Sequence, residues 1–177
     1  MDRALDCEYT FYGLLSLGSL VFLAGLFALL YLSFYKYPKG FRDARVVELL
    51  EDPKASPVRG TPVALRGRVI GRGAPGLFFS EDIKLDDGTG LILLDYNQVL
   101  PLINFFVGVF KTEGWLGRDV EVTGWYRRRV VPYVELYEMR VGEEAHHLWT
   151  AGVQKAGCAA LIAIGVLILL LSAVVLL

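Results

Sequence analysis

The stretch RDVEVTGWYRRRVVPYVELYEMRV, residues 118–141, alternates apolar and polar side chains on both sides of a basic turn. In its first half, apolar residues alternate with charged or hydroxyl residues: Val120, Val122 and Tyr126 against Asp119, Glu121 and Thr123. A period of two residues is the signature of a half-buried β-strand. The stretch therefore predicts two consecutive strands joined by a short turn.

Three earlier segments show the same period. They are TPVALRGRVIGR (61–72), the segment from Leu77 to Leu85, and LILLDY (91–96). The turn sequences GAPG and DDGTG separate them, and an Asp-Gly pair between two strands is a strong hairpin signal. With one helix before the last two strands, the element order is that of an OB-fold, a five-stranded Greek-key barrel.

The helix expected between the third and fourth strands is VLPLINFFVGVF, residues 99–110. At about 18 Å it is too short to cross a hydrocarbon core of ~30 Å. One apolar stripe is enough to close a small barrel, and Leu100, Ile103, Val107 and Phe110 form such a stripe. The remaining apolar residues are candidates for membrane or partner contact: Leu102, Phe105, Phe106 and Val109. A fully buried core helix and a re-entrant segment remain as alternatives.

Two segments are apolar enough for membrane helices. Phe11 to Tyr35 has 25 residues without a charge, and Gly157 to Leu177 has 21. Both reach the ~20 residues that a span requires. The first ten residues are net acidic and no small-residue cleavage site follows the first apolar run, so the pattern favours an uncleaved anchor over a signal peptide. The sequence is also poor in cysteine and methionine, which is typical of thermophiles.

The flanking charges predict the orientation of these spans. Four cations, Lys36, Lys39, Arg42 and Arg45, follow the first apolar run, whereas Arg3 is the one cation before it. Because lysine and arginine mark the cytoplasmic side, we expect a two-span protein of the cell membrane with a cytoplasmic central domain and both termini outside. The predicted organisation is a short N-terminus (1–10), a span (11–35), a juxtamembrane helix and linker (36–60), the barrel (61–142), a juxtamembrane segment (143–156) and a span (157–177).

The region 46–141 resembles a known domain type. The pieces DPKASPVRG, GLFFSED, DDGTGLILLDY and GWYRR are similar to the OB-like domain found with HtpX-like membrane zinc metalloproteases, and less specifically to NfeD-like membrane OB domains. The resemblance implies a role in membrane protein quality control. The protease motif H-E-x-x-H is absent from this sequence, so no catalytic residue is carried over.

The sequence offers no pattern typical of catalysis. Adjacent histidines, His146 and His147, project about 100° apart on a helix and do not readily chelate one ion, so we expect neither metal nor cofactor. GRGAPG lacks the lysine of a phosphate-binding loop. The carboxylates of Glu81, Asp82, Asp86 and Asp87 are explained by a strand edge and a turn. The sequence therefore predicts a protein that is not an enzyme.

Arg127, Arg128 and Arg129 form the most suggestive basic cluster. OB-folds bind single strands through aromatic side chains in a basic groove. However, residues 36–155 carry 17 Lys and Arg against 16 Asp and Glu, which argues against nucleic acid as a partner. We expect these arginines to contact anionic headgroups or a partner protein.

The resulting interpretation is a membrane-anchored, mainly β protein: a five-stranded OB-like barrel with one inter-strand helix, flanked by two transmembrane helices. The predicted function is that of a non-catalytic scaffold or regulator in a membrane complex. Its expected partners are membrane lipids and another membrane protein, with a homo-oligomer left open. The alternative is a membrane-tethered protein that binds single-stranded nucleic acid.

Overall fold

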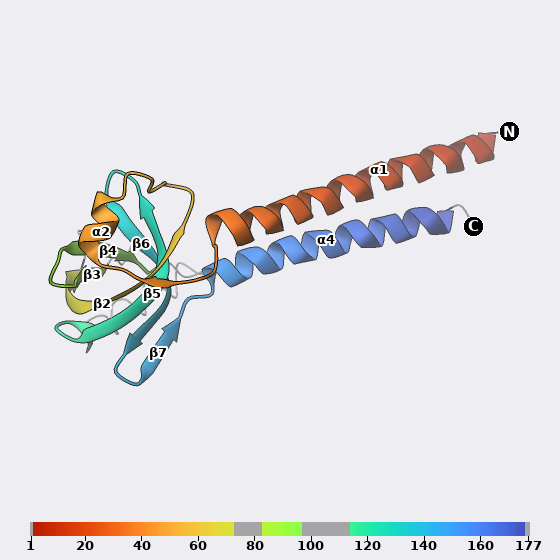
Figure 1. The fold of residues 1–177 in the computed structure, drawn as a ribbon. Helices are drawn as coiled ribbons and strands as arrows, with labels where there is room; N and C mark the ends of the chain where they lie inside the picture. The colour runs from red at the N-terminus through yellow and green to blue at the C-terminus, as the bar shows by residue number, and fades with distance from the viewer. Residues whose placement is uncertain (1, 73–82, 97–113, 176–177) are drawn as a thin grey trace. The chain divides into compact units, whose positions relative to one another are not determined.

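The computed structural model describes residues 2–72, 83–96 and 114–175. The chain divides into two compact units, a helical unit (residues 1–33 and 152–177) and a barrel unit (residues 34–151). Figure 1 labels their elements.

The barrel unit contains five strands that close on themselves. They are β2 (Thr61–Arg72), β3 (Ile83–Asp86), β4 (Leu91–Asp95), β5 (Asp119–Arg128) and β6 (Pro132–Val141). Antiparallel pairs join β2 to β3, β3 to β4 and β5 to β6, while β4 and β6 run parallel and β2 pairs with β5. This closure confirms the predicted OB-like barrel.

The period-two pattern places one face of each strand inside the barrel. The interior is filled by aliphatic and aromatic side chains, among them Val63, Leu65, Val69, Ile83, Leu85, Ile92, Leu94, Val120, Val122, Tyr126, Val134, Leu136 and Met139. A β-bulge lies between Thr123 and Gly124, opposite β6. A Cβ at Gly124 would collide with the carbonyl oxygen of Glu135, so the two strands approach closely there because this position is a glycine.

Shorter elements extend the barrel. The strand β1 (Arg42–Asp43) pairs with β2, and the helix α2 (Val46–Glu51) buries Val46 and Leu49 in the core. The strand β7 (Glu144–His147) pairs with β6 across a two-residue turn in which Gly142 has a φ of 63°. The sequence predicts a juxtamembrane region in this segment and does not predict β7. The strand shows no apolar alternation, and it is held by backbone pairing with β6.

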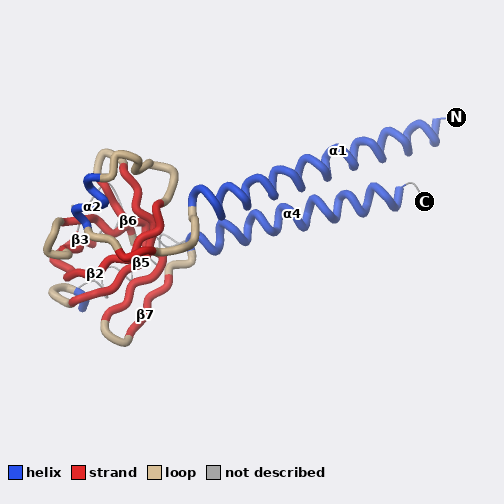
Figure 2. Tube along the Cα trace, viewed as in Figure 1, coloured by secondary structure: helices blue, strands red, loops and turns tan. Residues whose placement is uncertain are grey.

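The helical unit is formed by α1 (Asp2–Leu30), the first three residues of the π-helix η1 (Tyr31–Lys36), and α4 (Thr150–Val175) from Gly152 onward. Figure 2 shows these long helices in blue. Both are long and apolar enough to cross a membrane. The first begins at Asp2 rather than at Phe11, because the N-terminal segment contains no glycine or proline that would end a helix.

Small residues recur every seven positions on the buried side of each long helix. They are Gly18 and Gly25 in α1, and Cys158, Gly165 and Ser172 in α4. A Cβ at Gly165 would meet backbone atoms of Phe22 at 2.6–2.8 Å. Small residues at this spacing let helix backbones approach, as is usual between membrane helices.

Several predicted features lie outside the described residues. These are the first part of the second predicted strand, the inter-strand helix 99–110, and the contact residues assigned to that helix, Leu102, Phe105, Phe106 and Val109. They stay predictions.

Candidate functional site

The three consecutive arginines at the end of β5 have different surroundings. Arg127 is 2% exposed, whereas Arg128 and Arg129 are exposed. The strand alternation directs Tyr126 into the barrel and Arg127 to its outer surface, and another part of the chain covers Arg127 there. The basic cluster predicted from the sequence therefore separates into one buried and two exposed side chains.

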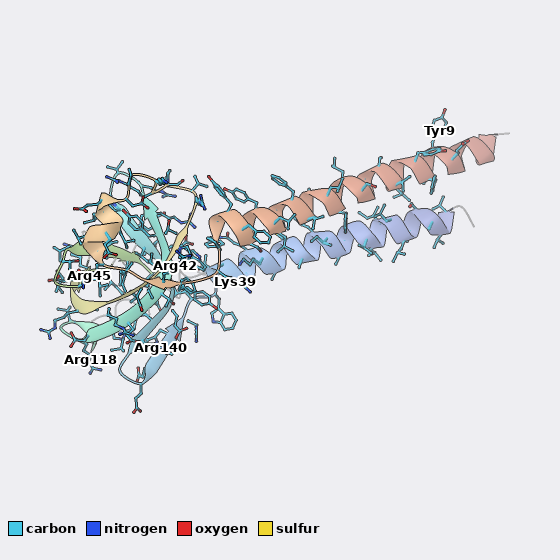
Figure 3. The ribbon with its side chains drawn as sticks, in the orientation of Figure 1. Tyr9, Lys39, Arg42, Arg45, Arg118 and Arg140 are labelled. Atoms are coloured by element: carbon cyan, nitrogen blue, oxygen red, sulfur yellow. The ribbon has the colours of Figure 1, made fainter. Side chains whose placement is uncertain are left out.

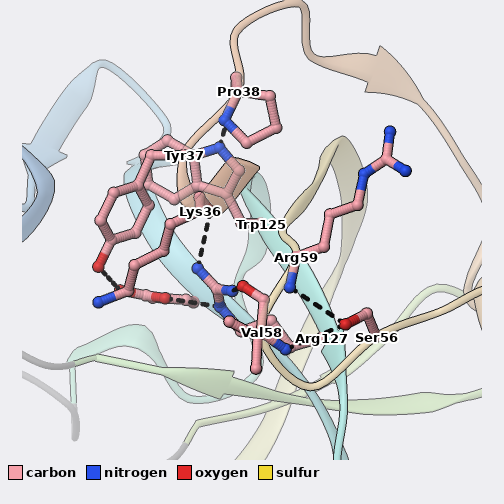
Figure 4. A network of polar contacts seen from close by, with 9 residues as sticks. Lys36, Tyr37, Pro38, Ser56, Val58, Arg59, Trp125 and Arg127 are labelled. Carbon is pink, nitrogen blue, oxygen red and sulfur yellow. Dashed lines mark hydrogen bonds and ion pairs between the residues drawn. The ribbon is translucent and has the colours of Figure 1, made fainter. Parts of the chain in front are cut away.

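Arg127 forms an ion pair and two further hydrogen bonds (Figure 4). Its Nε donates to Glu135 Oε2 at 2.9 Å, and its amino groups donate to the carbonyl oxygens of Val58 and of Lys36, the latter at 2.9 Å. The Tyr37 hydroxyl donates to the other carboxylate oxygen of Glu135 at 2.8 Å. A planar guanidinium with several fixed donors suits such a site better than a lysine would.

Neighbouring contacts hold the same segment. Trp125 Nε1 donates to the carbonyl oxygen of Pro38 at 2.8 Å, and the Gly60 N–H donates to that of Tyr35 at 3.3 Å. The rings of Tyr37 and Trp125 meet edge to face, with centroids 4.7 Å apart. We name this set the entry network: Lys36, Tyr37, Pro38, Val58, Trp125, Arg127 and Glu135. It binds the residues that follow the first apolar helix to the outside of the barrel.

The turn after β5 has a different character. The Arg129 guanidinium lies over the Tyr133 ring, 5.5 Å from its centroid. Val130 is fully exposed and Val131 is about half exposed. Arg128 donates to the carbonyl oxygen of Asp52 at 3.0 Å. We name residues 129–133 the tip; it presents a cation, an aromatic ring and two valines to solvent.

The tip continues onto the outer surface of the barrel. Tyr133 pairs with Leu93 in β4, and Leu93 pairs with Lys84 in β3. These three residues form a row across β3, β4 and β6. Burial raises the pKa of the Tyr133 phenol, and the nearby Arg129 and Arg127 charges oppose part of that rise. The ring is therefore neutral at ordinary pH and chemically suited to stacking.

The remaining polar residues have structural surroundings. His146 packs on the Trp115 ring at 5.1 Å between centroids, and His147 Nδ1 lies 3.4 Å from a Glu138 carboxylate oxygen. Among residues 2–72, 83–96 and 114–175, no group of three or more His, Cys, Asp or Glu could hold a metal ion. The histidines therefore belong to the β6–β7 surface.

Asp87 has a role that the sequence interpretation missed. Burial acts to raise the pKa of its carboxyl, but hydrogen bonds from Val46 N–H, from the Thr89 hydroxyl and N–H, and from Gly90 N–H outweigh this effect and lower it. The bond from Val46, at 2.7 Å, satisfies a free N–H at the start of α2. Asp87 thus joins the turn between β3 and β4 to α2.

No protein-family profile matches the sequence, and no curated protein matches it. Among solved structures, the chain is similar to an OBody bound to hen egg-white lysozyme (TM-score 0.39, 17% identity, 61% of this chain and 98% of that chain). It is also similar to a chain of a replication protein A heterotrimer bound to single-stranded DNA (TM-score 0.42, 13% identity, 70% of this chain and 98% of that chain). A third similar structure is the S. pombe Stn1–Ten1 complex (TM-score 0.34, 10% identity, 63% of this chain and 76% of that chain).

The sequence-based argument against nucleic acid as a partner is wrong. The replication protein A heterotrimer that resembles this chain is itself bound to single-stranded DNA. The physical reason is that a single strand contacts one face and two loops of an OB barrel. The charge summed over the whole domain therefore does not decide whether the domain binds a single strand. The resemblance to HtpX-like and NfeD-like domains stays a prediction.

Proposed function

We propose that this chain is a membrane-anchored OB-fold protein that binds single-stranded nucleic acid and acts by binding alone, without catalysis. The observation that carries the proposal is the pairing of Arg129 with Tyr133 beside the outer surface of β3 and β4. Strands two and three of the barrel and the loop between strands four and five are the parts with which OB-folds bind oligonucleotides. Here these parts are β3, β4 and the tip.

The chemistry of the tip suits a single strand. Every base has a π-face, so an aromatic side chain stacks on bases without strong sequence preference, at about 1–3 kcal/mol per base. Arg129 supplies a cation for the neighbouring phosphate and Lys84 supplies a second one farther along the row. Arg127 takes no part, since its guanidinium is already bound within the entry network.

The test uses the full-length chain in a mild detergent and a fluorescent deoxythymidine oligonucleotide. We expect Tyr133→Ala to weaken binding by about 1–3 kcal/mol, Tyr133→Phe to preserve it, and Arg129→Ala to reduce the salt dependence by roughly 0.7 in log–log slope. The matched controls are Tyr137→Ala and Arg140→Ala, an exposed aromatic and an exposed arginine paired with Glu138. Absence of binding at low salt, or equal losses in the controls, would refute the proposal.

A specific observation also favours a second candidate, a scaffold in a membrane complex. Val130 and Val131 protrude at the tip, and exposed apolar side chains at one place are typical of protein contacts. We expect Val130→Ser with Val131→Ser to release a co-purifying membrane protein. If the same proteins co-purify with the variant, this candidate is discarded.

The proposal includes the membrane topology inferred from the charges: two spans, a cytoplasmic barrel and both termini outside. After replacement of Cys7 and Cys158, single cysteines at Thr10 and Thr89 are exposed to an impermeant reagent on intact cells. We expect modification at position 10 and none at position 89. The reverse pattern would place the barrel outside.

A further inference from the structure

The barrel unit carries a cationic depression that the proposed function does not use. A cavity of about 410 Å³ lies between the segments 38–42 and 52–62. Four cations line it, Lys39, Arg42, Lys54 and Arg59, together with one carboxylate, that of Asp52. Figure 3 labels Lys39 and Arg42, and Figure 4 shows Arg59 beside the entry network.

These four cations differ from three exposed arginines elsewhere on the barrel surface. Arg66, Arg68 and Arg140 each form an ion pair with a neighbouring carboxylate, at 2.5–3.1 Å. Within the described part of the chain, no ion pair involves any of the four cations that line the depression. The excess of positive charge is therefore left for an external anion.

The polar groups nearby do not remove this excess. The Asp52 carboxylate accepts a hydrogen bond from the backbone N–H of Lys54 at 2.8 Å. The backbone carbonyl oxygen of Asp52 accepts one from the Arg128 guanidinium at 3.0 Å. Arg128 thus adds a further cation next to Asp52. Gly40, with a φ of 96°, turns the chain between Lys39 and Arg42, a conformation that favours glycine.

Chain connectivity keeps the depression near the end of the first apolar helix. Lys39 is three residues beyond Lys36, where that helix ends, so the two Cα atoms are within about 11 Å of each other. The entry network holds Lys36 and Pro38 against the barrel, and the depression includes Pro38. A site this close to a membrane helix is at the depth of lipid headgroups, where anionic lipids attract basic side chains.

We propose that the depression binds the phosphate of an anionic lipid headgroup, in the membrane leaflet where the first apolar helix ends at Lys36. Arginine donates two parallel hydrogen bonds to phosphate oxygens, and lysine binds phosphate as a point charge. Arg42 and Arg59 are the expected direct ligands, while Lys39 and Lys54 complete the neutralisation. This inference rests on the membrane anchoring in the proposed function and is independent of nucleic-acid binding.

The experiment measures the melting temperature of the full-length chain in a neutral detergent. A ligand that binds the native state raises this temperature by an amount that grows with the logarithm of 1 + [L]/Kd, where [L] is the free ligand concentration. The probes are short-chain phosphatidylglycerol, short-chain phosphatidylcholine and inorganic phosphate. We expect the melting temperature to rise with phosphatidylglycerol concentration, and the other two probes to need at least tenfold higher concentrations for the same rise. Lys39→Gln with Arg42→Gln, and separately Lys54→Gln with Arg59→Gln, should each weaken the phosphatidylglycerol effect at least tenfold.

The control is Arg66→Gln with Arg68→Gln, which removes the same charge from two exposed arginines that are already paired. An equal loss in this control would overturn the site, and an equal response to inorganic phosphate would overturn the lipid as its ligand. Displacement of the lipid effect by an oligonucleotide would assign the depression to nucleic acid instead. Tyr133→Ala, which tests the proposed function, should leave the lipid response unchanged. Release of the chain from membranes by alkaline carbonate would remove the anchoring on which the site depends.

Discussion

Arg127 and Arg129 are two residues apart in the sequence, yet they belong to regions with opposite properties. In the entry network, Arg127 is buried and bonded to a carboxylate and two carbonyl oxygens. At the tip, Arg129 is exposed and lies on the face of one ring. The role of an arginine in this barrel therefore depends on whether another part of the chain covers its side chain. The residues after the first apolar helix cover β5 at Arg127, and the tip extends beyond them.

The physical consequence is a difference in what each guanidinium can do. A buried charge that loses its partner is costly, so the groups of the entry network depend on one another. An exposed cation over a ring is worth about 0.5–1 kcal/mol and remains free to exchange its partners. The entry network therefore stabilises the barrel unit, and the tip is available to a ligand.

The largest expected effect is that of Arg127→Ala. It leaves the Glu135 carboxylate, whose side chain is only 16% exposed, without its cation and two carbonyl oxygens without their donor, which should destabilise the barrel unit by about 3–5 kcal/mol. Thermal or denaturant unfolding of the full-length chain in mild detergent, followed by tryptophan fluorescence, measures this loss. A change below about 1 kcal/mol would show that the two regions do not differ as described.

A smaller effect is expected from Trp125→Phe. This change keeps an aromatic ring beside Tyr37 but removes the hydrogen bond to the Pro38 carbonyl oxygen. We expect a loss of about 1–2 kcal/mol, made up of the hydrogen bond and some lost packing. If Arg127→Ala with Trp125→Phe loses less than the sum of the two single changes, then the entry network behaves as one coupled unit.

Tyr126→Phe tests the inward-facing side of the same strand. The Tyr126 hydroxyl is buried and, in the parts of the chain that the structure covers, has no hydrogen-bond partner. Its removal should therefore leave stability unchanged or raise it by about 1 kcal/mol. A loss above about 1 kcal/mol would mean that the hydroxyl is satisfied after all.

The same variant has a pH signature. Burial raises the pKa of Tyr126 above its ordinary value of 10.0; the Arg128 charge opposes this rise and the Asp52 charge adds to it, both with smaller contributions. Below pH 10 both states keep the proton and the stability is complete. As the pH rises through the raised pKa, the unfolded phenol ionises more readily, so stability is lost. Unfolding measured between pH 9 and 11 should show a shallower decline for Tyr126→Phe than for the unmodified chain.

The smallest expected loss of stability is that of Arg129→Ala, about 0.5 kcal/mol, because the side chain is exposed and its contact with the Tyr133 ring is worth little more. Unfolding under the same conditions as for Arg127→Ala gives the direct comparison. A loss similar to that of Arg127→Ala would remove the distinction between the two regions. A small loss of stability together with weakened oligonucleotide binding would sharpen it.

Much of the barrel was predictable because each strand carries its own period-two pattern. The alternation in 61–72 and 119–128 predicted the strands β2 and β5, and the Asp-Gly turn predicted the hairpin of β3 and β4. The short strand β7 was missed because its pairing with β6 depends on backbone groups, which every residue carries. The capping of α2 by Asp87 joins residues 41 positions apart, a distance at which local patterns carry no information.

The candidate site shows most clearly what local sequence patterns do not predict. Local sequence patterns were enough to predict the order of the barrel strands, the two long apolar helices and the cations near the ends of β5 and of the first helix. Folding brings together distant segments, and this is what buries Arg127, places Arg129 on Tyr133 and makes Lys39 and Arg59 line one depression. The reason is that hydrophobic periodicity is a local property of the chain, whereas burial and charge pairing depend on segments brought together by folding.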